Sequence, residues 1–411
     1  MTATVLGIDF GTSNSAAAVN EGGRARIIAL EPGRDTLPTA VFLDYATRAT
    51  LVGSDAVAAM IDGRQGRFMR SLKSILGTTL AREERQFLNR RLTLLDIIAE
   101  FLAEIRSRAE AVTGSMITHA VAGRPVHFHS ASARRDRQAE IDLAECYRQA
   151  GFSSVRFLPE PEAAARAAGP GKGIGLIVDI GGGTSDFTLF RFHDGGMDIL
   201  ASHGVRIGGT DFDKALNLAK VMPLLGMGDQ LRNTFGSGRN DVPRAVFHDL
   251  AAWEKIAFVY GPKSLRDSRQ MLRQAVTPER LARLVTVLEM ELGHDIAFAV
   301  EAAKIAANGT GLGKVDLNLI EPGLAPVLES ADLLAILWPL ADRIGAAARE
   351  VLAMAGIQSA DVSRVIFVGG SSLIGVIDRL MRSEFPKATF EHSDVFTAVV
   401  TGLALAAGEP A

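Results

Sequence analysis

Two segments, 170 positions apart, each place a carboxylate beside a glycine-containing turn. Asp9 precedes Phe-Gly-Thr-Ser-Asn, and Asp179 precedes Ile-Gly-Gly-Gly-Thr-Ser-Asp. Glycine lets backbone N–H groups approach an anion closely. A carboxylate at a strand end suits Mg²⁺, which keeps part of its water shell. Each segment is therefore predicted to bind phosphate and to present one carboxylate to a metal ion.

The candidate phosphate ligands in these turns offer a backbone N–H or a polar side chain. They are Gly11, Thr12, Ser13, Asn14, Gly181, Gly182, Gly183 and Thr184. A plain β-turn is commoner for an isolated copy of the first segment, and a flexible hairpin also fits the second alone. Repetition within one chain favours two turns that grip one polyphosphate from both sides, an electrostatic arrangement suited to phosphoryl transfer.

Other signatures of nucleotide or metal binding do not occur in the sequence. It has no G-x-x-x-x-G-K-[ST], G-x-G-x-x-G, H-E-x-x-H or C-x-x-C. His127 and His129 alternate after Pro125 and would share one face of a strand; without a third ligand, a surface strand is favoured over a metal pair. Cys146, the single cysteine, lies in a predicted helix and is expected in the core rather than as a nucleophile.

The composition describes an ordinary globular chain of two or three domains. Of its 411 residues, 47% are hydrophobic and 22% charged, and 44 basic against 47 acidic residues leave a net charge of −3. This balance predicts no broad attraction to nucleic acid or to an anionic membrane. No signal peptide and no apolar run of 18 residues is found, and one cysteine allows no internal disulfide, so a cytoplasmic location is expected.

Each turn is predicted to join two strands. Val5–Phe10 enters the first turn and Ala16–Val19 leaves it, while Gly175–Phe190 repeats the order strand, turn, strand. A repeat at this distance indicates two related lobes, since solenoid repeats are about 20–50 residues long. Strands and amphipathic helices alternate around both hairpins, so the predicted fold class is α/β.

Further elements are predicted from periodicity and from helix start and stop signals. Strands are expected at Arg24–Ala29, Thr118–Ala122, Val155–Leu158 and Val365–Val368, and helices at Thr93–Thr113, Asp136–Ala150, Glu162–Ala168, His294–Asn308, Ser330–Ala355, Ile374–Phe385 and Val395–Ala407. A Thr93-x-x-Asp96 capping pattern opens the first of these helices and Gly114 ends it. A break is expected at Pro339. Residues 31–77 show little periodicity, and 212–329 are predicted to be mostly helical.

Seven short motifs occur in one order between Gly7 and Gly402: GIDFGTSNS, LKSILG, FLPEPEAAARAAG, VDIGGGTSDF, GGTDFD, VEAAKIAAN and FVGGSS. Together they resemble the ATPase motifs of the DnaK-type heat-shock-70 chaperones, in the actin-like ATPase superfamily. The resemblance implies a duplicated, ribonuclease H-like two-lobe fold, with ATP or ADP and Mg²⁺ in the cleft between the lobes.

The resemblance also implies domain boundaries. Lobe I would comprise 1–173 plus 394–411, with an insertion at about 32–91. Lobe II would comprise 174–393, with its core at 174–217 and 330–393 and an insertion at about 218–329.

Site roles carry over by position. Asp9 and Asp179 would hold the waters of the metal, and Lys73 and Glu160 would orient the γ-phosphate and the attacking water. Asp186 and Thr184 would complete the catalytic group. The remaining nucleotide ligands would be Gly208, Gly209, Glu301, Lys304, Asn308, Gly369, Gly370 and Ser371. Without the resemblance, Lys73 would be interpreted as a solvated lysine and Glu160 as a helix-start carboxylate.

The sequence departs from the chaperone pattern at the base and at the C-terminus. Leu373 and Ile305 stand where the chaperones usually have arginines against adenine, which removes cation–π stacking. Arg134, Arg135 and Arg137 are equal candidates for an interlobe arginine switch. The sequence stops at Ala411, so a chain without the peptide-binding domain is expected, as in short YegD-like members of the family.

The resemblance therefore predicts a slowly hydrolysing, chaperone-like ATPase with nucleotide, and a protein client or co-chaperone, as partners. Two alternatives stay open: a nucleotide-switched actin-like filament or interaction protein, and a small-molecule kinase of the same superfamily.

Overall fold

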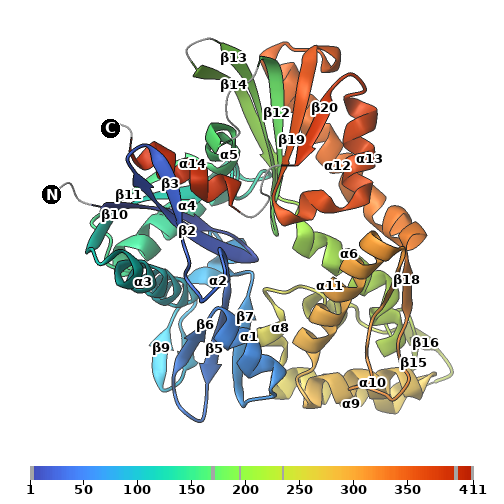
Figure 1. The fold of residues 1–411 in the computed structure, drawn as a ribbon. Coiled ribbons are helices and arrows are strands. Elements are labelled where there is room, and N and C mark those ends of the chain that lie inside the picture. The colour runs from blue at the N-terminus through green and yellow to red at the C-terminus, as the bar shows by residue number, and fades with distance from the viewer. Residues whose placement is uncertain (1–3, 168–171, 194–195, 234–235, 393–396, 409–411) are drawn as a thin grey trace. The chain divides into compact units, whose positions relative to one another are not determined.

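The computed structural model describes residues 4–167, 172–193, 196–233, 236–392 and 397–408 (Figure 1). The chain divides into two compact units. The larger unit comprises Met1–Gly209 and Asp342–Ala411, and the smaller comprises Thr210–Ala341. Both predicted hairpins lie in the larger unit.

The first sheet of the larger unit surrounds the first hairpin. Its strands are β1 (Thr4–Phe10), β2 (Asn14–Glu21), β3 (Arg24–Ile28), β10 (Ile117–Arg124) and β11 (Ser154–Pro159), in the order β11-β10-β1-β2-β3. The short β4 (Leu37–Pro38) pairs with β2 outside this row. β2 and β3 run antiparallel to their neighbours, whereas β10 and β11 run parallel. The strands predicted here are confirmed.

The second sheet repeats this plan around the second hairpin. Its strands are β12 (Gly173–Ile180), β13 (Ser185–His193), β14 (Gly196–Val205), β19 (Val362–Val368) and β20 (Thr389–His392), in the order β14-β13-β12-β19-β20. Again two antiparallel strands lie on one side of the first strand of the hairpin and two parallel strands on the other. The repeat seen in the sequence is therefore a repeat of topology, and the α/β fold class is confirmed.

Two helices share a core with both sheets. α5 (Glu160–Ala167) and α14 (Ala398–Ala407) pack together, and their buried alanine and leucine side chains join those of β10, β12, β13 and β19. They cross so closely that a Cβ atom at Gly402 would lie 1.7 Å from the carbonyl oxygen of Ala163. The start predicted for the last helix, Val395, falls outside the described residues.

α3 (Leu94–Thr113) and α4 (Ala133–Gln149) pack on each other and contact β10 and β11, respectively. The predicted capping box is present: the Thr93 hydroxyl accepts the Asp96 N–H at 3.2 Å, and the Asp96 carboxylate accepts the Thr93 N–H at 2.7 Å. Gly114 ends α3 in the left-handed region with φ 65°. Cys146 is buried in α4, as expected.

Residues 31–77 are more regular than their weak periodicity indicated. They hold β5 (Ala40–Asp44), β6 (Thr50–Val52), α1 (Ser54–Ile61), β7 (Gly66–Arg70) and the 3₁₀ helix η1 (Leu72–Ile75). They are followed by α2 (Thr79–Arg82), β8 (Arg85–Phe87) and β9 (Arg90–Leu92). The strands have at most five residues, and β5 is buried throughout, so no alternation marks them.

The smaller unit is mostly helical, as predicted. It contains most of α6 (Gly209–Lys220), then η2 (Met222–Leu225), β15 (Gln230–Arg232), β16 (Arg239–Asp241), α7 (Ala245–Leu250), α8 (Ile256–Val259), α9 (Pro262–Gln274), α10 (Pro278–Glu289), α11 (Gly293–Thr310), β17 (Leu312–Lys314) and β18 (Val327–Glu329).

α12 (Ser330–Ala355) leads back into the larger unit, where η3 (Ser359–Asp361), η4 (Gly370–Leu373) and α13 (Gly375–Glu384) follow. The break expected at Pro339 is wrong, because α12 continues through this residue. Proline removes one backbone hydrogen bond, while Leu337, Ala341 and Ile344 remain fully buried along the helix. No helix within the described residues is long and apolar enough to cross a membrane.

Candidate active site

The first turn closes tightly around one glycine. The pairing of β1 with β2 ends at Phe10 and Ser15, which leaves Gly11–Asn14 as the turn. A Cβ atom at Gly11 would lie 2.1 Å from the carbonyl oxygen of Asn14. Only glycine fits there without a shift of the backbone. Asp9, two residues earlier, therefore stands at a well-defined strand end.

The second turn joins β12 to β13 between Ile180 and Ser185. The Gly181 N–H donates to the carbonyl oxygen of Thr184 at 3.0 Å. Asp179 and Asp186 are direct cross-strand neighbours on the two sides of this turn. Asp179, predicted to face the metal, and Asp186, predicted to belong to the catalytic group, are thus held side by side by strand pairing.

The two turns lie against each other. A Cβ atom at Gly182 would lie 2.5 Å from the hydroxyl oxygen of Ser13, and one at Gly183 would lie 3.0 Å from that of Thr12. Side chains of the first turn therefore approach the bare backbone of the second. Backbone N–H groups and hydroxyl groups converge here, and these are the donors that bind phosphate.

Further glycines let backbone pack on the second turn. A Cβ atom at Gly208 would lie 2.5 Å from the Gly183 nitrogen, and the Gly209 N–H donates to the Gly181 carbonyl at 3.0 Å. Gly369 has φ 76°, and its Cβ atom would lie 2.7 Å from Oδ1 of Asp179. Three separate segments of the larger unit thus meet at the second turn.

Gly370 and Ser371 open η4, directly after Gly369. A Cβ atom at Gly209 would lie 2.4 Å from the Ser371 hydroxyl oxygen, so these predicted ligands also gather at this place.

Lys73 and Glu160 form a buried ion pair. Nζ of Lys73, on η1, lies 2.5 Å from Oε1 of Glu160, the first residue of α5. Lys73 is only 7% exposed, so the interpretation of this residue as a solvated lysine is wrong. Glu160 does begin a helix, yet it is buried as well. The sequence showed both residues but not their partnership, because 87 positions separate them.

Negative charge is crowded around this pair. Burial and the Glu160 carboxylate raise the pKa of Asp9 and that of Asp186 to about 7 each, and they also raise the pKa of Asp179. Burial alone would lower the pKa of Lys73, but Glu160, Asp9 and Asp186 raise it. A single ammonium leaves the four carboxylates under-compensated, so the site fits a divalent cation.

η1 is held by side chains that sequence reasoning missed. The Gly77 N–H donates to Asp142 at 2.9 Å, and Arg206 donates to the Ser74 carbonyl at 2.5 Å. The chain enters η1 through Ser71, which adopts φ 61°, a costly value for a residue with a side chain. Spacing gave no signal for Asp142, because it resembles any polar residue of an amphipathic helix.

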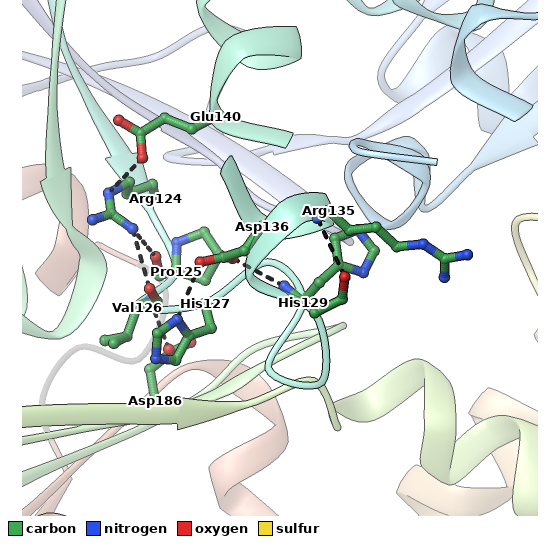
Figure 2. A network of polar contacts seen from close by, with 10 residues as sticks. Arg124, Pro125, Val126, His127, His129, Arg135, Asp136, Glu140 and Asp186 are labelled. Atoms are coloured by element: carbon green, nitrogen blue, oxygen red, sulfur yellow. Dashed lines mark hydrogen bonds and ion pairs between the residues drawn. The ribbon is translucent and has the colours of Figure 1, made fainter. Parts of the chain in front are cut away.

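Asp186 contacts the irregular segment that carries His127 and His129 (Figure 2). β10 ends at Arg124, so the surface strand expected for His127 and His129 is wrong. The Val126 N–H donates to Oδ1 of Asp186 at 2.8 Å. The Thr184 hydroxyl also bonds Asp186, and both bonds lower its pKa against the larger effect of burial. No three His, Cys, Asp or Glu side chains among the described residues are placed to hold a metal ion directly.

The predicted ribose and base ligands belong to the smaller unit. Glu301, Lys304 and Asn308 follow one another along α11. Lys304 is buried, and its Nζ lies 2.6 Å from Oδ1 of Asp213. The other carboxylate oxygen of Asp213, Oδ2, accepts the Trp253 indole N–H at 3.0 Å. Sequence reasoning quoted Asp213 only within the GGTDFD motif and did not predict this pairing.

The two residues that the resemblance placed against the base are both exposed to solvent. Ile305 is 63% exposed on α11, and Leu373 is 47% exposed at the end of η4. Neither side chain can donate a hydrogen bond or carry charge.

Comparison with known proteins agrees with this architecture. The model of the Hsp70 protein family matches residues 5–89 and 84–219, which together make up more than half of the chain. The chaperone protein DnaK of Elusimicrobium minutum (strain Pei191) is 28% identical over 419 aligned positions, which cover 99% of this chain and 58% of that protein. The chain thus spans less than two thirds of the length of this relative. Because the family match includes both repeated hairpins, the chain belongs to the Hsp70 family and has its actin-like ATPase fold.

Proposed function

We propose that this chain binds ATP and ADP with Mg²⁺ at the paired turns and slowly hydrolyses ATP. One observation carries the proposal. Two glycine turns from repeated hairpins contact each other, and a buried Lys73–Glu160 pair lies among the aspartates at their bases. This combination supplies anion donors, metal-side carboxylates and a hydrogen-bonding group for water in one place.

The roles follow from the chemistry of each group. Asp9 and Asp179 would hold magnesium. The N–H groups of Gly181, Gly182 and Gly183, with Thr12, Ser13 and Thr184, bind phosphate oxygens. Bound magnesium supplies positive charge that stabilises the charge developing on the phosphoryl oxygens.

Lys73 carries a second positive charge toward the terminal phosphate, and Glu160 orients the water. Asp186 is buried and keeps a raised pKa of about 7. It can accept a proton near neutral pH and supports the water network.

For the nucleoside we propose Glu301, Lys304 and Asn308, and also Gly369, Gly370 and Ser371. Leu373 and Ile305 offer apolar contact to the base without cation–π stacking. We therefore expect the site to prefer adenine over guanine less strongly than an arginine-lined site would.

The proposal also covers organisation and partners. The two lobes have the boundaries stated from the sequence, and their closure around nucleotide is the mechanical output. A protein client or co-chaperone is the proposed partner, and the cytoplasm is the proposed location.

Calorimetric titration of the full chain with Mg·ATP, Mg·ADP and Mg·GTP tests this function. We expect saturable binding of all three that becomes much weaker when EDTA removes the metal. Release of phosphate from ATP, measured in parallel and insensitive to added acceptor metabolites, separates hydrolysis from kinase chemistry. Absence of any metal-dependent binding would overturn the proposal, and nucleotide-dependent sedimentation as polymer would favour the filament alternative.

A further inference from the structure

The segment that carries His127 and His129 has no role in the function proposed above. It follows β10 and runs from Pro125 to His129 in the larger unit. Figure 2 shows its backbone passing between Asp186 and the start of α4. Its contacts join two parts of the candidate site that are distant in sequence.

One end of the segment is fixed to the second hairpin. The Val126 N–H donates to Oδ1 of Asp186 at 2.8 Å, and Asp186 is almost fully buried. Arg124, just before the segment, donates to the carbonyl oxygens of Pro125 and Val126 at 3.1 Å each, which restrains the chain on both sides of the Val126 N–H.

The other end is fixed to the segment that carries Lys73. His129 is only 6% exposed, and its Nε2 lies 2.6 Å from the carbonyl oxygen of Leu76. A carbonyl can only accept, so Nε2 carries the hydrogen of this bond. Burial lowers the pKa of His129, which is consistent with a neutral imidazole in this tautomer.

Asp136 holds the part of the segment that carries the two histidines. One carboxylate oxygen accepts the His129 N–H at 3.1 Å, and the other lies 3.2 Å from Nδ1 of His127 (Figure 2). Asp136 lies in the first turn of α4. Farther along the same helix, Asp142 accepts the hydrogen bond from the Gly77 N–H. The segment is therefore anchored to a helix and not only to the site.

With the bond from His129 to Leu76, each backbone carbonyl from Lys73 to Leu76 accepts a hydrogen bond. The Lys73 carbonyl accepts from the Leu76 N–H, the Ser74 carbonyl from Arg206, and the Ile75 carbonyl from Thr78. Leu76 is the next residue, and the imidazole of His129 supplies the donor that its carbonyl needs in the interior. Since η1 is entered through the unfavourable φ of Ser71, it needs such external holds to keep its shape.

We propose that His129 is a positioning residue: through the Leu76 carbonyl it fixes η1, and hence Nζ of Lys73, relative to Asp186 and Glu160. The kinetic consequence rests on the proposed ATPase function, whereas the structural one does not. His129 contacts neither nucleotide nor water in this scheme, and it acts only through the backbone that carries Lys73.

The experiment compares three substitutions of His129. His129→Met fills the space without a donor, and His129→Asn ends its amide near the position of Nδ1, short of Leu76. His129→Gln places an amide N–H near the position of Nε2 and can restore the bond. His119→Met is the matched control, because His119 lies on β10 and pairs with the Ser154 hydroxyl at an exposed site outside this network.

The first readout is hydrogen exchange of the nucleotide-free chain. We expect the Ser74, Leu76 and Gly77 amides to exchange about tenfold faster in His129→Met and His129→Asn, since a lost buried bond lowers local protection. His129→Gln and His119→Met should leave these rates near those of the parent chain. Unchanged protection in His129→Met and His129→Asn, or a His129→Gln variant as unprotected as they are, would overturn the proposal.

The second readout is kinetic. His129→Met and His129→Asn, which have no donor within reach of the Leu76 carbonyl, should lose about tenfold in kcat for ATP with unchanged affinity for Mg·ATP. Misplacement of a positioned group affects the reacting geometry more than binding. A parallel fall of kcat, affinity and melting temperature would show a merely structural role and would also overturn the proposal. If the parent chain binds no Mg·ATP, the proposed function fails. The exchange rates alone then decide whether His129 fixes η1 through the Leu76 carbonyl.

Discussion

The two glycine turns share a topology but divide their chemistry differently. The first contains one glycine, and its Thr12 and Ser13 side chains reach toward the second. The second contains three glycines and presents bare backbone, against which Gly208 also packs. In the proposed site the first turn thus contributes mainly side-chain hydroxyl groups, and the second contributes mainly backbone N–H groups together with the Thr184 hydroxyl. Duplication of a fold supplies two similar supports, and the residues at each tip then specialise.

The largest expected effect comes from adding one methyl group beside the second turn. In Gly208→Ala, the new Cβ atom would lie 2.5 Å from the Gly183 nitrogen, where only backbone movement can relieve the overlap. We expect loss of Mg·ATP binding by more than about 100-fold, since misplacement by 1 Å is already costly. Calorimetry measures the affinity.

The matched control is Gly261→Ala, because nothing lies within 4 Å of a Cβ atom at Gly261 and its φ is −137°. Equal affinities in the two alanine variants would show that the second turn does not need bare backbone.

The second-largest effect is expected from removing Lys73, which belongs to neither turn. Lys73→Ala should retain Mg·ATP affinity but lower the single-turnover hydrolysis rate by about 100-fold, the scale of one lost electrostatic contact to the developing charge. Quenched-flow measurement of phosphate release provides the rate. If affinity falls as much as the rate, Lys73 binds the ground state and its assigned role is wrong.

A smaller, metal-specific effect is expected at the base of the second turn. Asp179→Ala should weaken Mg·ATP binding about tenfold or more while changing metal-free nucleotide binding little, because only the carboxylate toward the cation is removed. Titrations with and without EDTA measure the difference. Asp9→Ala is the companion variant in the first turn, and a loss confined to one of the two would show that the turns share the metal unequally.

The smallest effect is a pH dependence in the absence of metal and nucleotide. Burial and the Glu160 carboxylate raise the pKa of Asp9 and of Asp186, one from each hairpin, from the ordinary aspartate value of 3.8 to about 7. Between these values the folded chain binds more protons than the unfolded chain, so stability falls as pH rises from about 4 toward 7 and the full loss is present above 7.

Thermal unfolding between pH 5.5 and 8 measures this trend, and each of Asp9→Asn and Asp186→Asn should flatten it, by about 5 °C in melting temperature. The same slope in the parent chain and in both variants would exclude these carboxylates as its source.

Much of the local structure was accessible from the residues alone. The capping box of Thr93 and Asp96, the helix end at Gly114 and the strands on both sides of each turn were predicted and are present. Such features depend on neighbours within a few positions. The continuous helix through Pro339 was missed, because burial along α12 outweighs a local preference that the sequence shows in isolation.

The residues of the candidate site were easier to predict from the sequence than the contacts between them. The motif order pointed to Lys73, Glu160, Asp179 and Asp186, but the holds on η1 from Asp142, Arg206 and His129 were not foreseen. His127 and His129 illustrate the reason. Their alternation indicated a strand face, whereas β10 ends before them and the chain turns toward Asp136.

By itself the sequence determined that one strand–turn–strand pattern occurs twice, where its glycines must lie, and which carboxylates follow the strands. These properties are local, since they depend on backbone dihedral preferences and on alternation within short windows. Only the tertiary structure decided that Lys73 pairs with Glu160, that the turns touch, and that a buried imidazole holds the Leu76 carbonyl. Those contacts join residues tens of positions apart, and they arise from sheet register and core packing, which no short stretch of sequence encodes.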